Sequence, residues 1–338
     1  MTGPECCGIR SSDRFEIGSF LELDFKNTGE YFPDDCNLAR LNSGRSGIYH
    51  ALRLLNCTEI YLPYYLCPDV KEFLLRKSIR INYYCISVNF EPIIDRIEEK
   101  SAILIVNYFG IMSERILHSV SERFCNVIID NCASFFSKAL PGSYNVYSCR
   151  KFFGVPDGCY ISGPEAGTKV FEYPQDQSSD TSLFLLKRIE KGCAMTYQER
   201  MKNEERINSS DVLSMSVLTR SIMCSLDYDF IRKKRSENFR YASSLYEHYN
   251  QIDISKFVDE QSIPLFYPLV VKDKELVDKL RIHSIYTGRR WMSVLKDVKN
   301  NSFEALLSSY MVPIPVDQRY GQEELNYCFN VFKNVVKL

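Results

Sequence analysis

The sequence predicts an α/β fold with a mostly parallel central sheet. Two strand-like runs, Ala102–Val106 and Val127–Ile129, are apolar at every position, which is typical of strands buried on both faces. Between residues 40 and 161, segments with helical spacing alternate with such runs, and this alternation indicates a sheet covered by helices on both sides. The length of 338 residues suffices for a large core and a second, smaller part.

Periodicity gives the order of elements in the first half of the chain. Apolar side chains at i, i+3, i+4 and i+7 mark helices, and short runs rich in Ile, Tyr and Val between turn residues mark strands. A proline is well placed at the first position of a helix. Helices are expected over 48–55, from Pro68, from Pro92 to Ile97 and over 116–124, with strands at 59–63, 79–84, 102–106, 127–129 and 159–161.

The composition changes after residue 161. Residues 162–190 are rich in Gly, Pro, Asp and Ser, which predicts a mobile loop or flap. Residues 211–249 are helical in composition, and their basic run at 232–235 is interpreted as a solvated helix face, with phosphate binding as the alternative. A small C-terminal α+β domain is expected from a strand over 263–271 and helices over 274–283 and 322–336.

Charge and cysteine usage exclude several classes of function. The 42 Lys and Arg against 43 Asp and Glu leave a net charge of −1, so no broad attraction to nucleic acid or to an anionic membrane is available. No apolar run is long enough to span a membrane, and charges near the N-terminus argue against a signal peptide, so a cytoplasmic protein is expected. The 13 cysteines contain no C-x-x-C pair and the four histidines are far apart, so we expect reduced thiols and no metal site.

Two polar motifs lie where strands of the predicted sheet end. Asn42–Gly47 precedes a helix, where glycines, backbone amides and Arg45 suit an anion; a plain helix cap is the alternative. Asp130 follows the buried strand 127–129, and a carboxylate there needs a partner, such as a protonated ring nitrogen. The alternative for Asp130 is a cap on the following helix.

Two further motifs complete the set. Lys151 follows Ser148 in a Ser-x-x-Lys sequence. The flanking Phe152 and Phe153 predict that its amine is desolvated and nucleophilic. The alternative is an ordinary lysine on the surface. Tyr65 follows the strand 59–63, where an aromatic ring is suited to stack on a flat cofactor or to fill the core. A protein that holds pyridoxal phosphate needs a phosphate-binding site, an aromatic ring, an aspartate and a lysine, and these motifs together provide all four.

With these residues in order, the chain resembles the DegT/DnrJ/EryC1/StrS family of sugar aminotransferases. The resemblance is strongest over residues 41–161, with weaker matches at 285–288 and 314–319, and its most specific element is Ser-x-x-Lys followed by a Pro-Asp-Gly turn. It implies the aspartate-aminotransferase fold, fold type I, with a large cofactor domain over 39–235 and a small domain over 236–338. The N-terminal segment 1–38 is expected to pack with the small domain.

The resemblance also implies roles for individual residues. Ser43, Gly44 and Arg45 take the positions that seat the cofactor phosphate, with Arg45 where the family usually has Thr, and Ser148 contacts the same phosphate. Asp130 matches the aspartate on the pyridine nitrogen, and Lys151 matches the lysine that binds the cofactor as a Schiff base. The chain departs from the family pattern at Ala133, where Gln or His is usual, and in the spacing between Ser148 and Lys151.

The implied activity is amination of a keto-sugar carried on a nucleotide, with an amino acid such as glutamate as donor, in the synthesis of a cell-surface polysaccharide or related sugar. A homodimer is expected from the resemblance. Two alternatives stay open: another reaction of a pyridoxal phosphate enzyme, such as deoxysugar dehydration, and a non-catalytic homologue that acts as a binding module. Arg289 and Arg290 are candidates to bind the donor carboxylate or a nucleotide phosphate, with surface salt bridges as the alternative.

Overall fold

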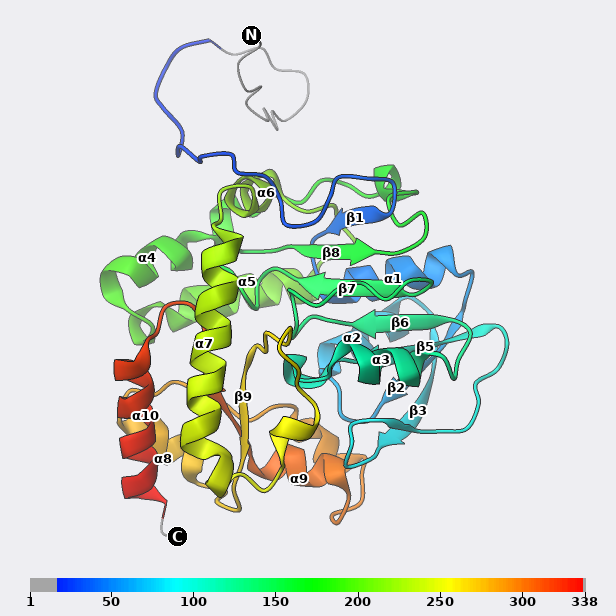
Figure 1. The fold of residues 1–338 in the computed structure, drawn as a ribbon. Coiled ribbons are helices and arrows are strands. Elements are labelled where there is room, and N and C mark those ends of the chain that lie inside the picture. The colour runs from blue at the N-terminus through cyan, green and yellow to red at the C-terminus, as the bar shows by residue number, and fades with distance from the viewer. Residues whose placement is uncertain (1–16, 337–338) are drawn as a thin grey trace.

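An eight-stranded sheet forms the centre of the molecule (Figure 1). The structure is a computed structural model, and it describes residues 17–336. The strand order of the sheet is β1-β8-β7-β6-β5-β2-β3-β4, and the pairs β7–β6, β6–β5, β5–β2 and β2–β3 are parallel. The pairs β1–β8, β7–β8 and β3–β4 are antiparallel. The strands are β1 (Leu38–Leu41), β2 (Glu59–Pro63), β3 (Arg80–Ile86), β4 (Pro92–Ile93), β5 (Ser101–Val106), β6 (Val127–Asp130), β7 (Tyr144–Ser148) and β8 (Cys159–Ser162).

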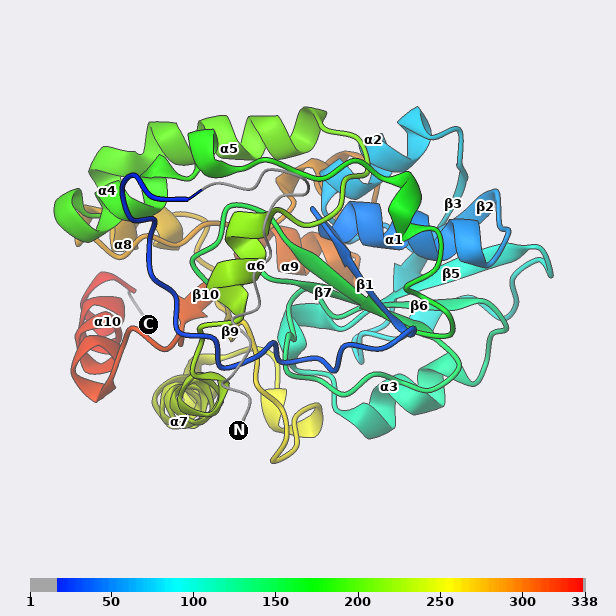
Figure 2. The same cartoon turned by 90° about the horizontal axis from the view of Figure 1, so that it is seen from above.

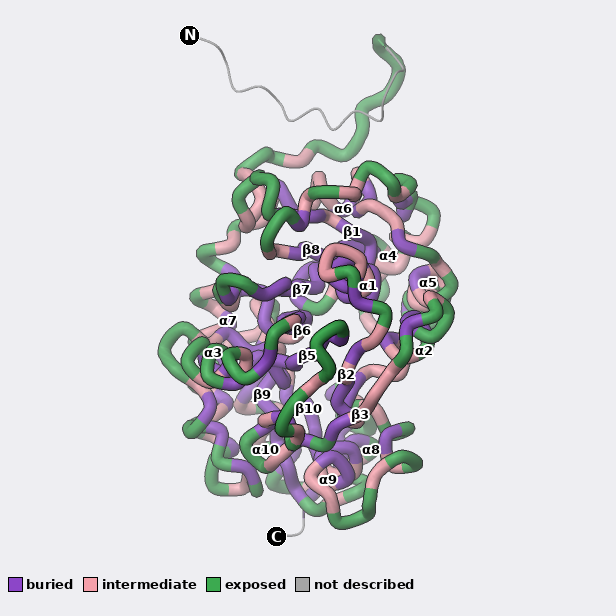
Figure 3. The backbone as a smooth tube through the Cα atoms, turned by 90° about the vertical axis from the view of Figure 1, so that its right-hand side faces the viewer, coloured by how far each residue is buried: buried purple, intermediate pink, exposed green. Residues whose placement is uncertain are grey.

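Helices cover both faces of this sheet, as the apolar strands predict. Every residue of β5, β6 and β7 is buried, which requires packing on both sides. Figure 2 shows α1 (Gly44–Leu54), α2 (Pro68–Arg76) and α5 (Tyr197–Ser209) on one side of the strands and α3 (Glu114–Ser121) on the other. Figure 3 shows the buried part of the chain concentrated along these central strands and α1. The predicted mostly parallel α/β sheet is confirmed.

A second, two-stranded antiparallel sheet lies in the C-terminal part. It pairs β9 (Phe266–Val270) with β10 (Met311–Pro315), and it is accompanied by α8 (Leu276–Ile282), α9 (Phe303–Tyr310) and α10 (Gln322–Val335). The helix α7 (Tyr228–Tyr246) connects the two parts and runs unbroken across residue 235, where the large domain was expected to end. It is preceded by the short helix α6 (Val217–Met223).

The N-terminal segment packs differently from the expectation. Thr28 donates to the carbonyl of Cys224, and Glu30 pairs with Arg40 and accepts from the hydroxyl of Tyr160. These partners belong to the large part of the molecule and not to residues 236–338, with which the segment was expected to pack. The cause is the aromatic sequence at residues 31 and 32, whose two rings insert into an apolar cluster beside β7 and β8. The part of this segment before residue 17 lies outside the described residues.

Two predictions of local structure were wrong. Residues 92–97 do not form a helix: Pro92 and Ile93 form β4, which turns back on β3. Phe90 is buried in the middle of that turn with a φ of 62°, and its burial holds the chain in a hairpin rather than a helix. The loop predicted over 162–190 ends in α4 (Leu183–Lys191), because four apolar side chains there have helical spacing that the Gly- and Pro-rich composition before them obscures.

Aromatic side chains form a second core next to the main one. Phe135 is fully buried at its centre and contacts the rings of Phe32, Phe153 and Tyr228. Aromatic pairs of this kind prefer edge-on or tilted contacts, which most of these pairs show. The cluster also contains Tyr31, Phe136, Tyr147, Phe152 and Tyr160.

We expect Phe135→Ala to lower the free energy of unfolding by about 3–5 kcal/mol, since it removes a fully buried ring from this cluster. Urea unfolding followed by circular dichroism measures the change. Phe171→Ala is the matched control, because the Phe171 side chain is exposed, and it should leave the midpoint nearly unchanged. Equal, small effects of the two substitutions would contradict the packing described.

Candidate active site

The strand register brings the predicted site residues to one edge of the sheet. Cys159 in β8 pairs with both Leu41 at the end of β1 and Ser148 at the end of β7. Asp130 at the end of β6 pairs with Val146 in β7, two residues before Ser148. The segment that begins at Asn42, the serine and the aspartate therefore leave the sheet at the same edge, the carboxyl ends of the parallel strands, where open α/β sheets bind ligands.

The N-terminus of α1 lies directly against the segment that follows Asp130. An added Cβ on Gly44 would come within 2.7 Å of the Cys132 sulfur, so the helix start and this segment are in contact. Ser43 caps the helix by accepting from the amide of Ser46, as the capping alternative predicts. The amides of Gly44 and Arg45 have no partner in the described part of the chain, which leaves an anion-binding helix start open.

Asp130 is buried, bonds to the following segment and has no cationic partner among the described residues. It is 8% exposed, and its Oδ1 accepts from the amide of Cys132 at 2.9 Å. The Cys132 thiol also forms a hydrogen bond with this carboxylate, and no described residue forms an ion pair with it. Burial raises the pKa of the Cys132 thiol well above its usual range, and the Asp130 carboxylate raises it further. A buried carboxylate without a cationic partner is costly, so Asp130 suits a positively charged or proton-bearing ligand atom.

The lysine loop differs from the expectation in one respect. Lys151 is exposed, and it has no ion pair or hydrogen bond in the described part of the molecule, so the predicted desolvation of its amine was wrong. Phe152 and Phe153 are buried in the aromatic cluster instead, and they anchor the loop without covering the amine. The amine still lies near the site, since its charge opposes the rise in the pKa of the Cys132 thiol that burial and Asp130 cause.

Arg45 is buried at the start of α1 with unused donors. Its Nη1 donates to Oδ1 of Asn208 at 2.7 Å and lies 3.8 Å from a carboxylate oxygen of Asp69. Its Nε and Nη2 have no hydrogen-bond partner although both atoms are buried. Burial lowers the pKa of this guanidinium, and Asp69 opposes that change. Buried donors are normally satisfied, so these two nitrogens indicate a place for an anion.

Helix α5, which follows the segment predicted to be a flap, packs over the lysine loop. Asn203 donates to the carbonyl of Pro156 at 2.7 Å, and Glu204 forms an ion pair with Arg150 beside Lys151. Asn208, the partner of Arg45, lies on the same helix. The Glu204 carboxylate therefore neutralises Arg150, and among the described residues on this side Lys151 has no carboxylate partner while Arg45 has only the long contact with Asp69. Sequence reasoning missed α5 because nothing in residues 197–209 relates them to residues fifty positions earlier.

Tyr65 lies in the core and presents no open ring face. It is fully buried, and its ring contacts Tyr108 and Trp291. Its hydroxyl is buried without a hydrogen-bond partner. The aromatic platform predicted for this residue is therefore corrected to the core alternative: Trp291, from the C-terminal part, covers the ring.

The two arginines beside Trp291 form no surface salt bridge. Arg289 donates to the backbone carbonyls of Ser309 and Lys274, so its role is structural. Arg290 is exposed, lies over the ring of Phe266 at 5.3 Å, and has no carboxylate partner among residues 17–336. The alternative of surface ion pairing was thus wrong for both residues.

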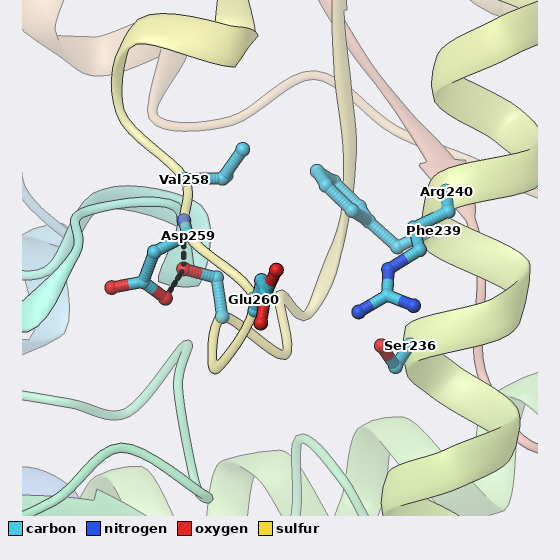
Figure 4. A pocket seen from close by; sticks show the side chains of 7 residues that line it. Ser236, Phe239, Arg240, Val258, Asp259 and Glu260 are labelled. Carbon is cyan, nitrogen blue, oxygen red and sulfur yellow. Dashed lines mark hydrogen bonds between the residues drawn. The ribbon is translucent and has the colours of Figure 1, made fainter.

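One cavity lies away from these residues. Its volume is about 560 Å³, and it opens between α7 and the loop that follows Val258 (Figure 4). It shares no residue with the sheet edge. The cavity is lined by Ser236, Phe239, Arg240, Val258, Asp259, Glu260 and Ser262.

Among the described residues no group of three or more His, Cys, Asp or Glu is arranged to bind a metal ion. No helix in the same part of the chain is long and apolar enough to cross a membrane.

The fold matches solved structures of sugar aminotransferases. The sugar aminotransferase CalS13 from Micromonospora echinospora aligns with a TM-score of 0.59 and 16% identity over 89% of this chain and 88% of its own. NtdA from Bacillus subtilis, with bound cofactor PMP, aligns with a TM-score of 0.62 and 14% identity over 89% of this chain and 73% of its own. A DegT DnrJ EryC1 StrS aminotransferase from Brucella abortus aligns with a TM-score of 0.57 and 11% identity over 89% of this chain and 86% of its own.

At these identities the likeness establishes the fold, and the fold type I architecture implied by the sequence is confirmed. No protein-family model and no curated protein sequence matches the chain.

The contact between Gly44 and Cys132 gives a test of the site's construction. We expect Gly44→Ala to destabilise the protein by about 1–3 kcal/mol, because the new methyl group overlaps the Cys132 sulfur. In a Cys132→Ala background the same substitution should cost much less, since the sulfur is gone. Urea unfolding of the four proteins measures the coupling. An equal cost of Gly44→Ala in both backgrounds would show that the two segments do not touch.

Proposed function

We propose that this protein is a pyridoxal phosphate-dependent aminotransferase that converts a nucleotide-linked keto-sugar to an amino-sugar, with glutamate as the expected amino donor. The observation that carries the proposal is the sheet edge itself. There a buried carboxylate with no cationic partner among the described residues, an open helix start with buried, unpartnered donors, and an unpaired lysine amine come together. These three features match the three polar parts of the cofactor: its ring nitrogen, its phosphate and its aldehyde.

The phosphate would be held at the start of α1. The free amides of Gly44 and Arg45 and the partial positive charge of the helix start favour an anion there. The unused Nε and Nη2 of Arg45 would supply two charge-assisted hydrogen bonds. Ser43 and Ser148, both buried at the same edge, offer hydroxyl donors. An arginine in this position provides the charge that the usual threonine lacks.

Asp130 and Lys151 would carry the chemistry. When bound, pyridoxal phosphate supplies a ring that withdraws electrons from the carbon bearing the amino group. Asp130 has no cationic partner among the described residues, so its carboxylate would be able to hold a proton on the ring nitrogen. Lys151 Nζ has no competing partner in the described part of the chain, so it would be free to bind the aldehyde and then to move a proton as a general base and acid.

The proposed substrate class rests on the similar structures. CalS13 is a sugar aminotransferase, and the protein from Brucella abortus is a DegT DnrJ EryC1 StrS aminotransferase. A place in polysaccharide or related sugar synthesis follows from that substrate class. We also propose a homodimer, because helix α4 has no buried residue although Leu186 and Ile189 are large and apolar. We propose a cytoplasmic location, and the lack of a disulfide among the described cysteines supports it.

A non-catalytic binding module is the second candidate. Ala133 stands where the family pattern has Gln or His, so no side chain of that kind reaches toward the cofactor from this position. If purified protein stays colourless with added pyridoxal phosphate, this alternative is supported and the enzyme proposal fails. Near-visible absorbance that borohydride bleaches, together with turnover of glutamate and a nucleotide keto-sugar, is the result that we expect.

Lys151→Ala should lower the rate of transamination by about 10²–10⁴-fold, because it removes the general base and acid. Lys138→Ala is the matched control, since Lys138 is an exposed lysine that pairs only with Glu114. The rate is measured as glutamate consumed in the presence of a nucleotide keto-sugar. A Lys151→Ala protein that turns over at the wild-type rate would eliminate the assigned role.

Asp130→Asn should retain the fold, because the amide oxygen can still accept from the amide of Cys132. It should lower turnover strongly, since a neutral amide does not hold a proton on the ring nitrogen. Steady-state kinetics beside circular dichroism separates the two effects. Unchanged turnover in a folded Asp130→Asn protein would remove Asp130 from the proposed mechanism.

A further inference from the structure

The basic run at residues 232–235 ends in a deeply buried cation. Lys233 is exposed, as a solvated helix face requires, but Arg235 is only 1% exposed. No carboxylate lies within 4.0 Å of its guanidinium among the described residues. Burial lowers its pKa to about 10, although the more distant Asp317 carboxylate opposes that change, so Arg235 is still a cation at neutral pH. Burying an unpaired charge is costly, and such a residue usually has a specific task.

The contacts of Arg235 converge on the residue after the proposed catalytic lysine. Its Nη2 donates to the carbonyl of Phe152 at 3.3 Å, and its guanidinium lies over the Phe152 ring at 4.4 Å. Its Nε donates to Oε1 of Gln318 at 2.8 Å, and Nε2 of Gln318 in turn donates to the same Phe152 carbonyl at 3.0 Å. One peptide oxygen therefore accepts two hydrogen bonds from two side chains that also bond to each other.

These contacts connect three distant segments. Arg235 lies on α7, Phe152 lies in the lysine loop, and Gln318 follows β10 in the C-terminal part. The loop is already turned by bonds from the amides of Phe152 and Phe153 to the carbonyl of Cys149. The Lys151 side chain itself has no hydrogen bond or ion pair with any residue between 17 and 336. The backbone beside the lysine is therefore held from several directions while its amine stays free.

We propose that Arg235 and Gln318 are positioning residues that fix the backbone of the lysine loop, so that the Lys151 amine is presented at the sheet edge. This inference rests on the proposed function, because it assumes that Lys151 is the reacting amine. A role limited to packing α7 against its neighbours would stabilise the fold equally well, but it would not couple these side chains to turnover.

The test uses Gln318→Met, Arg235→Met and Arg235→Lys, with Lys233→Met as the control on the exposed face of the same helix. In folded protein without added cofactor, hydrogen–deuterium exchange reports on residues 149–153. We expect the loop to exchange about tenfold faster or more in Gln318→Met and Arg235→Met, less so in Arg235→Lys, and at the wild-type rate in Lys233→Met.

With pyridoxal phosphate bound, the same variants should separate kcat from KM. We expect kcat to fall about 10- to 100-fold in Gln318→Met, with the KM for glutamate little changed, since a misplaced reacting group affects the chemical step. Arg235→Lys, which keeps the charge, should recover part of the kcat lost in Arg235→Met. If Arg235→Met does not fold, the result for Gln318→Met tests the inference by itself. That variant is expected to fold, because Gln318 is only partly buried.

Two results are decisive against the inference. Wild-type exchange of the loop in Gln318→Met and Arg235→Lys would overturn it, and so would a wild-type kcat in both. If wild-type protein neither binds pyridoxal phosphate nor turns over, the proposed function fails instead. The exchange comparison still reports whether the two side chains fix the loop, so the two failures are distinguishable.

Discussion

The site depends on the pairing of one strand, β8, with two others. Because β8 pairs antiparallel with both β1 and β7, Cys159 lies between Leu41 and Ser148, two residues more than a hundred positions apart in the chain. This register places the start of α1 next to the end of β7, and the parallel pairing of β7 with β6 adds Asp130. A shift of one residue would turn each of these side chains to the other face of the sheet. The chemistry proposed for the edge therefore follows from backbone hydrogen bonding.

Small side chains make this arrangement possible. Gly44 lies against the Cys132 sulfur, and Gly47 leaves room for the side chains of Val146 and Cys159. The helix can thus approach the sheet closely enough for its free amides to face the ligand side. Cys132 and Cys159 act in this contact as small buried hydrophobic side chains.

Local pattern was sufficient to predict the sheet, its covering helices and the placement of Ser43, Asp130, Ser148 and Lys151 after strands. These features depend on periodicity and on the general behaviour of parallel sheets, which are visible within a short window of sequence. The wrong predictions depend on distant partners. Residues 92–97 form a strand and loop because Phe90 is buried, and Tyr65 is a core residue because Trp291 covers it. Arg235 could not be told from its exposed neighbours, since its partners Phe152, Gln318 and Leu265 lie in segments that are distant in the sequence.

The central claim is that Lys151 binds pyridoxal phosphate at this sheet edge. Its most direct test is borohydride reduction of the protein with bound pyridoxal phosphate, followed by digestion and mass spectrometry of the labelled peptides. The account predicts a single stoichiometric pyridoxyl label on Lys151, lost in protein reduced without cofactor. A label spread over surface lysines, or stoichiometric labelling of a different lysine, would contradict it.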